Sequence, residues 1–206
     1  MNRMIKLLMI SDIFVITGFG LVEPILAIFI KENLVGGTIF AAGIASTLFI
    51  VTKSIIQLPF SRYVDNHNHK TKWLVIGMFF IAIVPFFYLF AKDITAIYIA
   101  QIIYGVGAGL AYPTWLGLWS THLDKKHESF EWSMYSSATG LGTAATAAIG
   151  AGVAEYAGFH YAFIAAGIMS LVGCFILLAL EKGQENPAMT RQYHKKRKLL
   201  HHVKHQ

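Results

Sequence analysis

Long apolar stretches separated by short polar segments dominate the chain. Six such stretches lie at about 7–30, 38–60, 73–91, 94–118, 131–157 and 160–180. A helix needs about 20 apolar residues to cross the hydrocarbon core of a bilayer. The strands of a membrane barrel would instead give short segments of alternating polarity, which are not seen here. The pattern therefore predicts an all-α membrane protein whose transmembrane domain, residues 1–182, has six transmembrane helices.

The composition agrees with this class of protein. Of 206 residues, 55% are hydrophobic and only 14% are charged, whereas a soluble domain has about 25% charged residues. With 15 Phe, nine Tyr and four Trp, the chain is too aromatic to be intrinsically disordered. A single cysteine, Cys174, excludes a disulfide-stabilised scaffold. An integral membrane protein is the class that remains.

Lys and Arg are distributed unevenly between the two sets of loops. Fourteen of them lie on the side that holds both termini, while the other side has only Lys31 and Lys92. Cytoplasmic loops of membrane proteins carry such an excess of Lys and Arg. We therefore expect both termini to be cytoplasmic, in a multi-pass protein of the plasma membrane.

Residues 183–206 form a basic tail outside the six spans. Its core is the run His194-Lys195-Lys196-Arg197-Lys198, followed by three more histidines. We expect a solvated tail that follows the positive-inside rule, with attraction to anionic lipid as an alternative. Metal binding by the histidines and RNA binding by the basic run are further alternatives. The formal net charge of +6 comes mostly from this tail, so it does not indicate a nucleic-acid partner, and no metal or cofactor is expected.

Small residues recur at helical spacing in the fourth and fifth spans. Gly105 and Gly109 are four residues apart in the fourth span, a spacing that allows neighbouring helices to approach closely. The fifth span has two such series. One contains Gly142, Thr146 and Gly150, and the other contains Gly140, Ala144, Ala148 and Gly152. We expect these glycines to serve helix packing.

Ionisable residues inside the spans are the strongest candidates for function. Burying a charge in a membrane is costly, and such residues mark solute or proton pathways unless they are paired. Asp12 and Glu23 lie eleven residues apart in the first span, on one face of a continuous helix. Lys53 lies in the second span. The expected path for a substrate or proton consists of Asp12, Glu23, Lys53, Gln57, Gln101 and Tyr104.

Two interpretations of Asp12 and Lys53 remain open at this point. They either line the polar path or form a structural ion pair, with Lys53 reaching toward the headgroups. For Glu23 the path is favoured, because no cation in the same half of the bilayer stands out as its partner.

The loop between the second and third spans resembles a known family. Its sequence, SRYVDNHNHK over 61–70, is similar to the loop signature of the major facilitator superfamily, with Asp65 and Lys70 at its acidic and second basic positions. Residues 104–113 resemble the fourth helix of that family, and 140–158 its glycine-rich fifth helix. Gln101 stands where many members have an arginine.

The resemblance covers about residues 3–182 and implies one six-helix half of a twelve-helix carrier. A homodimer with parallel chains would restore the full architecture, while a hetero-pair with another half, or a fragment of a longer protein, are alternatives. The expected function is transport of a small solute by alternating access, with protons as a candidate coupling ion. A non-transporting membrane scaffold or assembly module is the alternative. No enzyme is expected, since no hydrolase or metalloprotease motif appears.

Overall fold

The computed structural model describes residues 2–66 and 70–184, with side chains as far as residue 178. Within these ranges the chain forms seven helices. They are α1 (Arg3–Gly20), α2 (Glu23–Asn33), α3 (Ile39–Asp65), α4 (Lys70–Phe90), α5 (Ile94–His122), α6 (Glu128–Tyr156) and α7 (Phe159–Gln184). To within one residue, each predicted span falls inside one helix or, for the first span, inside two. The predicted basic tail, from residue 185 onward, lies outside the described residues.

The first span is broken in the middle, so the expectation of one continuous helix was wrong. α1 ends at Gly20, and α2 begins at Glu23. At the junction the N–H of Leu21 donates to Gly18 O at 3.2 Å and the N–H of Val22 to Phe19 O at 2.9 Å, in tight i to i−3 turns. Pro24 has no N–H to continue the α-helical pattern, but it is well suited to the first turn of the next helix.

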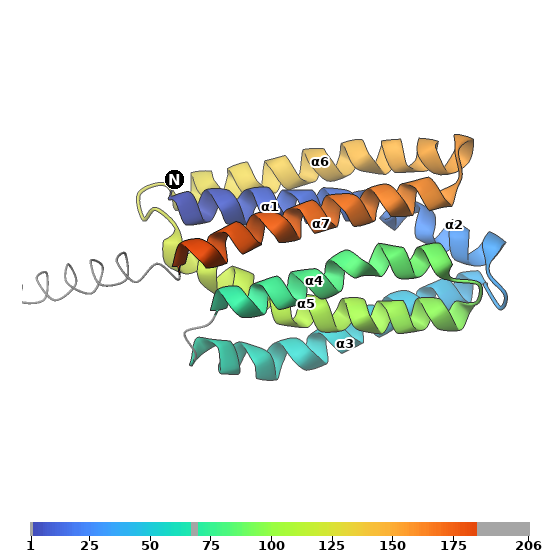
Figure 1. The fold of residues 1–206 in the computed structure, drawn as a ribbon, viewed down its shortest axis with the longest axis horizontal. Helices are drawn as coiled ribbons and strands as arrows, with labels where there is room; N and C mark the ends of the chain where they lie inside the picture. The colour runs from blue at the N-terminus through green and yellow to red at the C-terminus, as the bar shows by residue number, and fades with distance from the viewer. Residues whose placement is uncertain (1, 67–69, 185–206) are drawn as a thin grey trace, which may run out of the picture.

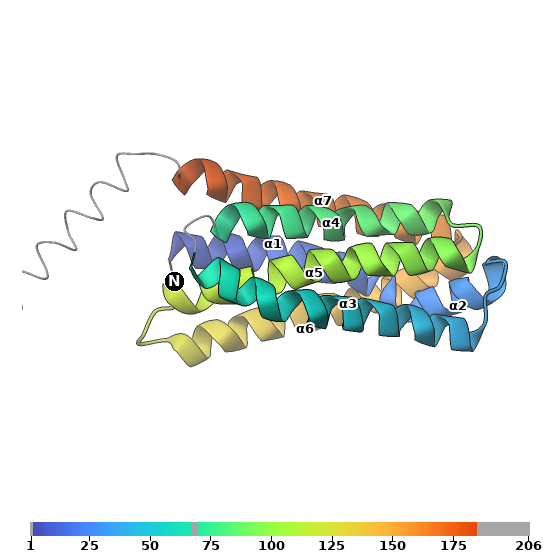
Figure 2. The ribbon, with the colours of Figure 1, turned by 90° about the horizontal axis from the view of Figure 1, so that it is seen from below.

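The helices run side by side along the long axis in three layers (Figures 1 and 2). α4 and α7 form one outer layer, α1 and α5 the middle layer, and α3 and α6 the opposite outer layer. The N-terminus and the end of α7 lie at one end of the bundle, here called the N-terminal end. α2 and the loops that flank it lie at the other, the far end.

Five segments are long and apolar enough to cross a membrane: the α1–α2 pair, α3, α4, α5 and α7. α6 is as long as α5, with 29 residues, and lies alongside the other helices (Figure 1). Its many Gly, Ala, Ser and Thr residues make it less apolar. The chain is thus an all-helical protein with five or six apolar membrane helices, and the count of six stays a prediction.

Glycines of α5 allow it to pack closely against helices on two sides. A Cβ at Gly105 would lie 2.6 Å from Thr52 Cβ of α3, and one at Gly109 would lie 2.9 Å from Ile56 Cβ of α3. On another face, a Cβ at Gly107 would lie 2.8 Å from the carbonyl oxygen of Gly77 in α4. Close packing through small residues holds membrane helices together. α5 is therefore fixed between α3 and α4.

The two series of small residues in α6 face different surroundings. A Cβ at Gly142 would lie 2.3 Å from Thr17 Cγ2 of α1, and one at Gly150 would lie 2.1 Å from the carbonyl oxygen of Leu21. By contrast, a Cβ at Gly140 or Gly152 would meet nothing within 4 Å. The first series packs α6 against the first span. The second lies on the open side of the bundle.

At the far end, the loop between α2 and α3 pairs with the loop between α4 and α5. The N–H of Val35 donates to Lys92 O and the N–H of Ile94 donates to Val35 O, each at 3.1 Å. Asp93 caps α5 by accepting a hydrogen bond from the N–H of Ala96 at 3.1 Å. This isolated bridge ties the end of α2 to the start of α5.

Candidate functional site

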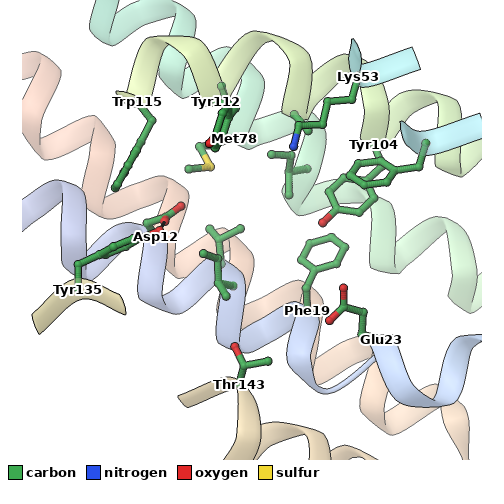
Figure 3. Close-up of a pocket in the computed structure, with 16 residues that line it drawn as sticks. Asp12, Phe19, Glu23, Lys53, Met78, Tyr104, Tyr112, Trp115, Tyr135 and Thr143 are labelled. Carbon is green, nitrogen blue, oxygen red and sulfur yellow. Dashed lines mark hydrogen bonds between the residues drawn. The ribbon is translucent and has the colours of Figure 1, made fainter. Parts of the chain in front are cut away.

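A cavity of about 280 Å³ lies in the middle of the bundle (Figure 3). Asp12 and Tyr135 lie toward its N-terminal end, and Glu23 lies toward its far end. Its walls come from six of the helices and combine charged and aromatic side chains. The lining residues that carry the argument below are Asp12, Phe19, Glu23, Phe49, Lys53, Tyr104, Tyr112, Trp115 and Tyr135. We call it the central cavity.

Asp12 is almost enclosed, with 8% of its surface exposed. The hydroxyl of Tyr135, on α6, donates a hydrogen bond to Asp12 Oδ2. A buried carboxylate in a membrane helix needs such a partner, because desolvation is expensive. The contact connects α1 to α6 across the N-terminal side of the cavity (Figure 3).

Lys53 projects from α3 into the same cavity. Its Nζ lies 4.6 Å from the centroid of the Tyr112 ring, a cation–π arrangement that stabilises an ammonium group out of water. Among the described residues it forms no ion pair with Asp12. Of the two interpretations of these residues, the structural ion pair is absent, and both side chains line the cavity (Figure 3).

Glu23 is the first residue of α2, directly after the helix break. The continuous helix assumed for Asp12 and Glu23 does not exist, yet both side chains reach the central cavity. Glu23 also lines a second cavity of about 150 Å³. The Glu23 carboxylate therefore lines both cavities.

The second cavity lies at the far end and is here called the far-end cavity. Its lining comes from the end of α1, α2, the first half of α3, the end of α4 and the first half of α5. It includes Leu26, Ile30, Ser46, Tyr88, Gln101 and Tyr104. Gln101, predicted for the path, lines this cavity and not the central one, and it is only 4% exposed. Gln57, also predicted for the path, lines neither cavity.

Three stacked rings stand where the two cavities meet. The Tyr104 ring stacks on Phe19 at 4.6 Å and on Phe49 at 4.2 Å, between ring centroids. The rings come from α5, α1 and α3, and all three residues line both cavities. Tyr104 was expected on the path. Its two phenylalanine partners were not, because a phenylalanine in an apolar helix gives no separate signal.

A second aromatic cluster closes the N-terminal side. Trp115 and Trp119 stack at 4.9 Å, Trp132 lies 5.4 Å from Trp119, and Tyr135 lies 5.0 Å from Trp115. Sequence reasoning missed these residues as well. The sequence held one indication for Tyr135. It is the eighth residue of α6 and Asp12 is the tenth of α1, and both helices start at the same end, so the two residues lie at a similar depth in the bundle.

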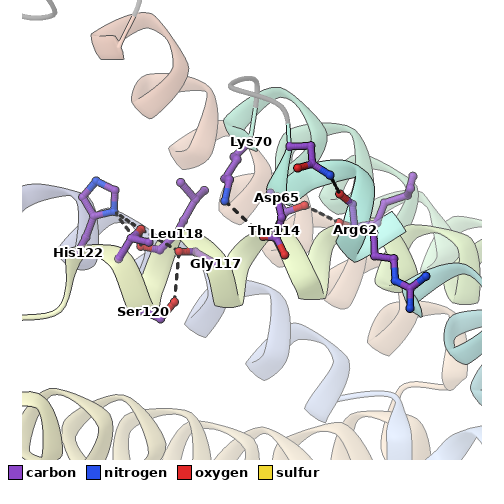
Figure 4. Close-up of polar contacts among 11 residues, drawn as sticks. Arg62, Asp65, Lys70, Thr114, Gly117, Leu118, Ser120 and His122 are labelled. Carbon is purple, nitrogen blue, oxygen red and sulfur yellow. Dashed lines mark hydrogen bonds and ion pairs between the residues drawn. The ribbon is translucent and has the colours of Figure 1, made fainter. Parts of the chain in front are cut away.

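The loop motif also forms a contact, at the N-terminal end (Figure 4). Lys70 Nζ lies 3.6 Å from Asp65 Oδ1 and so connects the end of α3 to the start of α4. Lys70 also lies beside Gly117 of α5, where an added Cβ would be 3.6 Å from its Nζ. Lys70 is largely covered and Asp65 largely exposed, which limits the stability of the pair itself to about 1 kcal/mol or less.

The side chain of Asp124, in the next loop at this end, bonds only to residues 126 and 127 among the described residues. The backbone N–H of Lys126 donates to Asp124 Oδ1 at 3.2 Å, and His127 Nδ1 lies 3.3 Å from Oδ2. These hydrogen bonds lower the pKa of Asp124 below its ordinary value, the one from Lys126 most.

The central cavity therefore offers two carboxylates, one ammonium group and several aromatic faces to a small molecule. Aromatic walls with a few polar groups are typical of small-molecule sites. Among the described residues, no group of three or more His, Cys, Asp or Glu side chains could hold a metal ion.

Comparisons with known proteins place this geometry in context. A family model described as Major Facilitator Superfamily matches residues 8–205. Quinolone resistance protein NorA of Staphylococcus aureus, in strains that include Mu50 and N315, is 25% identical over 118 residues, which cover 57% of this chain and 30% of NorA. The crystal structure of the POT family transporter PepTSo matches with a TM-score of 0.76 and 14% identity, over 88% of this chain and 38% of that one. The chain thus spans less than half the length of each of these proteins.

Proposed function

Since the chain belongs to the Major Facilitator Superfamily, we propose that it moves a small solute across a membrane by alternating access, as a secondary transporter. One observation carries the proposal. Three ionisable residues of apolar helices, Asp12, Glu23 and Lys53, converge on a cavity in the middle of the bundle. Such residues are costly in a membrane and mark the routes of solutes and ions.

The lining of the central cavity suggests the class of solute. Its aromatic side chains suit a flat ring system, and its two carboxylates with one ammonium suit a molecule that carries an amine. The name of NorA connects that relative with quinolones. We propose an aromatic solute with a basic group, and a quinolone is a suitable probe.

Coupling to protons is the second part of the proposal. Asp12 and Glu23 can each bind and release a proton, and both face the central cavity. A carboxylate reachable from the cavity can exchange its proton for a solute during the transport cycle. We assign the coupling role to one of these two residues.

The third part concerns a partner half. α3 and α6 form one outer layer of the bundle (Figure 2), and each presents large apolar side chains outward, such as Ile55 of α3 and Leu141 of α6. The open series of small residues, Gly140 to Gly152, lies on α6 as well. A second six-helix unit could pack on this layer. We propose a homodimer, with a hetero-pair as the alternative, in the plasma membrane and with both termini cytoplasmic.

The test uses purified protein in liposomes. With a pH gradient across the membrane, a fluorescent quinolone should accumulate at least fivefold over protein-free liposomes, and an ionophore that collapses the gradient should stop it. The mass of the protein in lipid nanodiscs should be that of two chains. If no gradient of either direction gives accumulation, transport fails and a non-transporting membrane module becomes the better account.

Asp65→Asn should slow this uptake severalfold without reducing the amount of folded protein. The substitution removes the charge that faces Lys70 at nearly constant size, and it loosens the contact between α3 and α4 at the N-terminal end. Asp124→Asn is the matched control, because among the described residues the Asp124 side chain bonds only to Lys126 and His127. Initial rates of quinolone uptake would measure the effect. Equal uptake rates for both variants would show that the loop with Asp65 and Lys70 only connects α3 to α4 and does not influence transport.

A further inference from the structure

We propose that the stack of Phe19, Tyr104 and Phe49 is a gate between the central cavity and the far-end cavity. This inference rests on the proposed transport function, since a gate matters only if something passes. The three residues come from three different helices, α1, α5 and α3, and each lines both cavities. The rings therefore form the shared wall of the two spaces.

The geometry of the stack suits a barrier that opens. Both ring pairs are nearly parallel, with interplanar angles of 18° and 21°. Stacked rings exclude water, yet each pair shifts an equilibrium by only about two- to tenfold. No hydrogen bond to another side chain of the described residues holds the Tyr104 hydroxyl in place. Such a wall separates two cavities without locking them apart.

The helix break provides a place for the movement. Phe19 belongs to the last turn of α1, and Glu23 is the first residue of α2. The junction between them consists of short turns, which adjust more readily than the middle of a helix. A change at Leu21 and Val22 would displace the Phe19 ring relative to Tyr104.

Glu23 is the polar group placed at this gate. It lines the central cavity together with Lys53 and the far-end cavity together with Gln101. When the rings separate, a solute amine or a proton bound at Glu23 passes between the two spaces without crossing a purely apolar zone. The far-end cavity is then a vestibule of the central cavity.

The test measures thiol accessibility and requires no solute. The one cysteine of the chain is first replaced (Cys174→Ala), and a thiol is introduced behind the gate by Ala108→Cys or in front of it by Ser46→Cys. Ala108 lines only the central cavity, and Ser46 lines only the far-end cavity. A charged, membrane-impermeant methanethiosulfonate is added from the side that faces the far end, which an epitope tag at the N-terminus identifies.

Tyr104→Leu removes both ring pairs and Phe49→Leu removes one. We expect the labelling rate at position 108 to rise at least fivefold in the first variant and about twofold or more in the second. Phe79→Leu is the matched control, because Phe79 lies on the outer side of α4 and is 51% exposed. It should change the rate less than twofold.

Position 46 reports on general loosening, and its labelling rate should stay within twofold in every variant. Equal rates at position 108 with and without the ring substitutions would overturn the gate, and so would a parallel rise at both positions. Because labelling needs no transported solute, altered labelling without any quinolone uptake would reject the transport function and leave the gate standing. Phe49→Leu keeps most of the side-chain volume, so the test does not depend on Tyr104→Leu folding well.

Discussion

Liposomes with the Asp12→Asn variant should take up a quinolone at least tenfold more slowly than liposomes with the unaltered protein. Asparagine keeps the size of the side chain but can neither bind a proton nor attract the amine of a solute. A hydrogen bond to a charged group contributes about 1.5–3 kcal/mol, which corresponds to at least a tenfold change. The initial rate of uptake under a fixed pH gradient measures the effect.

Two further variants separate the role of Asp12 from general damage. Tyr135→Phe removes the hydroxyl that donates to Asp12 but keeps the ring in its aromatic cluster, so we expect an intermediate loss of about two- to tenfold. Glu155→Gln is the matched control, because Glu155 lies exposed in the last turn of α6 and lines neither cavity. Its rate should be unchanged. If Asp12→Asn still accumulated the quinolone at the normal rate under a pH gradient, Asp12 would not be the coupling residue. Glu23→Gln should then be the variant that loses gradient-driven accumulation.

Gly150→Ala should destabilise the protein strongly, while Gly152→Ala, two residues along the same helix, should not. The added Cβ at position 150 would lie 2.1 Å from the carbonyl oxygen of Leu21, a backbone atom that cannot rotate away. Overpacking of this kind costs about 1–3 kcal/mol. At position 152 the Cβ meets nothing within 4 Å, and alanine favours a helix over glycine by about 1 kcal/mol.

Because the gain in helix propensity applies at both positions, we expect the two variants to differ by the overpacking cost alone, about 1–3 kcal/mol in the free energy of unfolding. Unfolding by SDS, followed by circular dichroism at low protein concentration, would measure this difference. If both variants proved equally stable, α6 would not be held against the helix break by this contact. A loss confined to Gly152→Ala would instead indicate that the open series of α6 is packed against another chain.

The sequence was sufficient to predict the helices and most of the ionisable lining of the cavity. Each predicted apolar stretch coincides with a long helix or, for the first, with two, because a helix needs about 20 apolar residues to cross a bilayer. The cost of a charge in the membrane singled out Asp12, Glu23 and Lys53, and the structure places all three in one cavity. The position of a helix and the presence of a charge within it are properties of a single segment, so they can be predicted from the order of residues alone.

Features that depend on two helices were beyond the sequence. Gly150 and Gly152 look equivalent in the chain, but Gly150 lies against Leu21 at the end of the first helix, whereas Gly152 lies on the open side of α6. In the same way, the placement of Gln57 outside both cavities depends on the rotation of α3 in the bundle. The break at Leu21 and Val22 was missed for a different reason, because both residues are apolar and the first apolar stretch runs through them without interruption.

The bridge at Val35 makes the far end behave as a clasp. Because Val35 exchanges hydrogen bonds with Lys92 and Ile94, the α2–α3 loop and the α4–α5 loop are joined through their main chains, whatever their side chains are. Spreading α2 away from α5 would require breaking both of these backbone hydrogen bonds. Any widening of the far end must therefore move these two loops together. The conformational change must then occur deeper in the bundle, at the junction of α1 and α2.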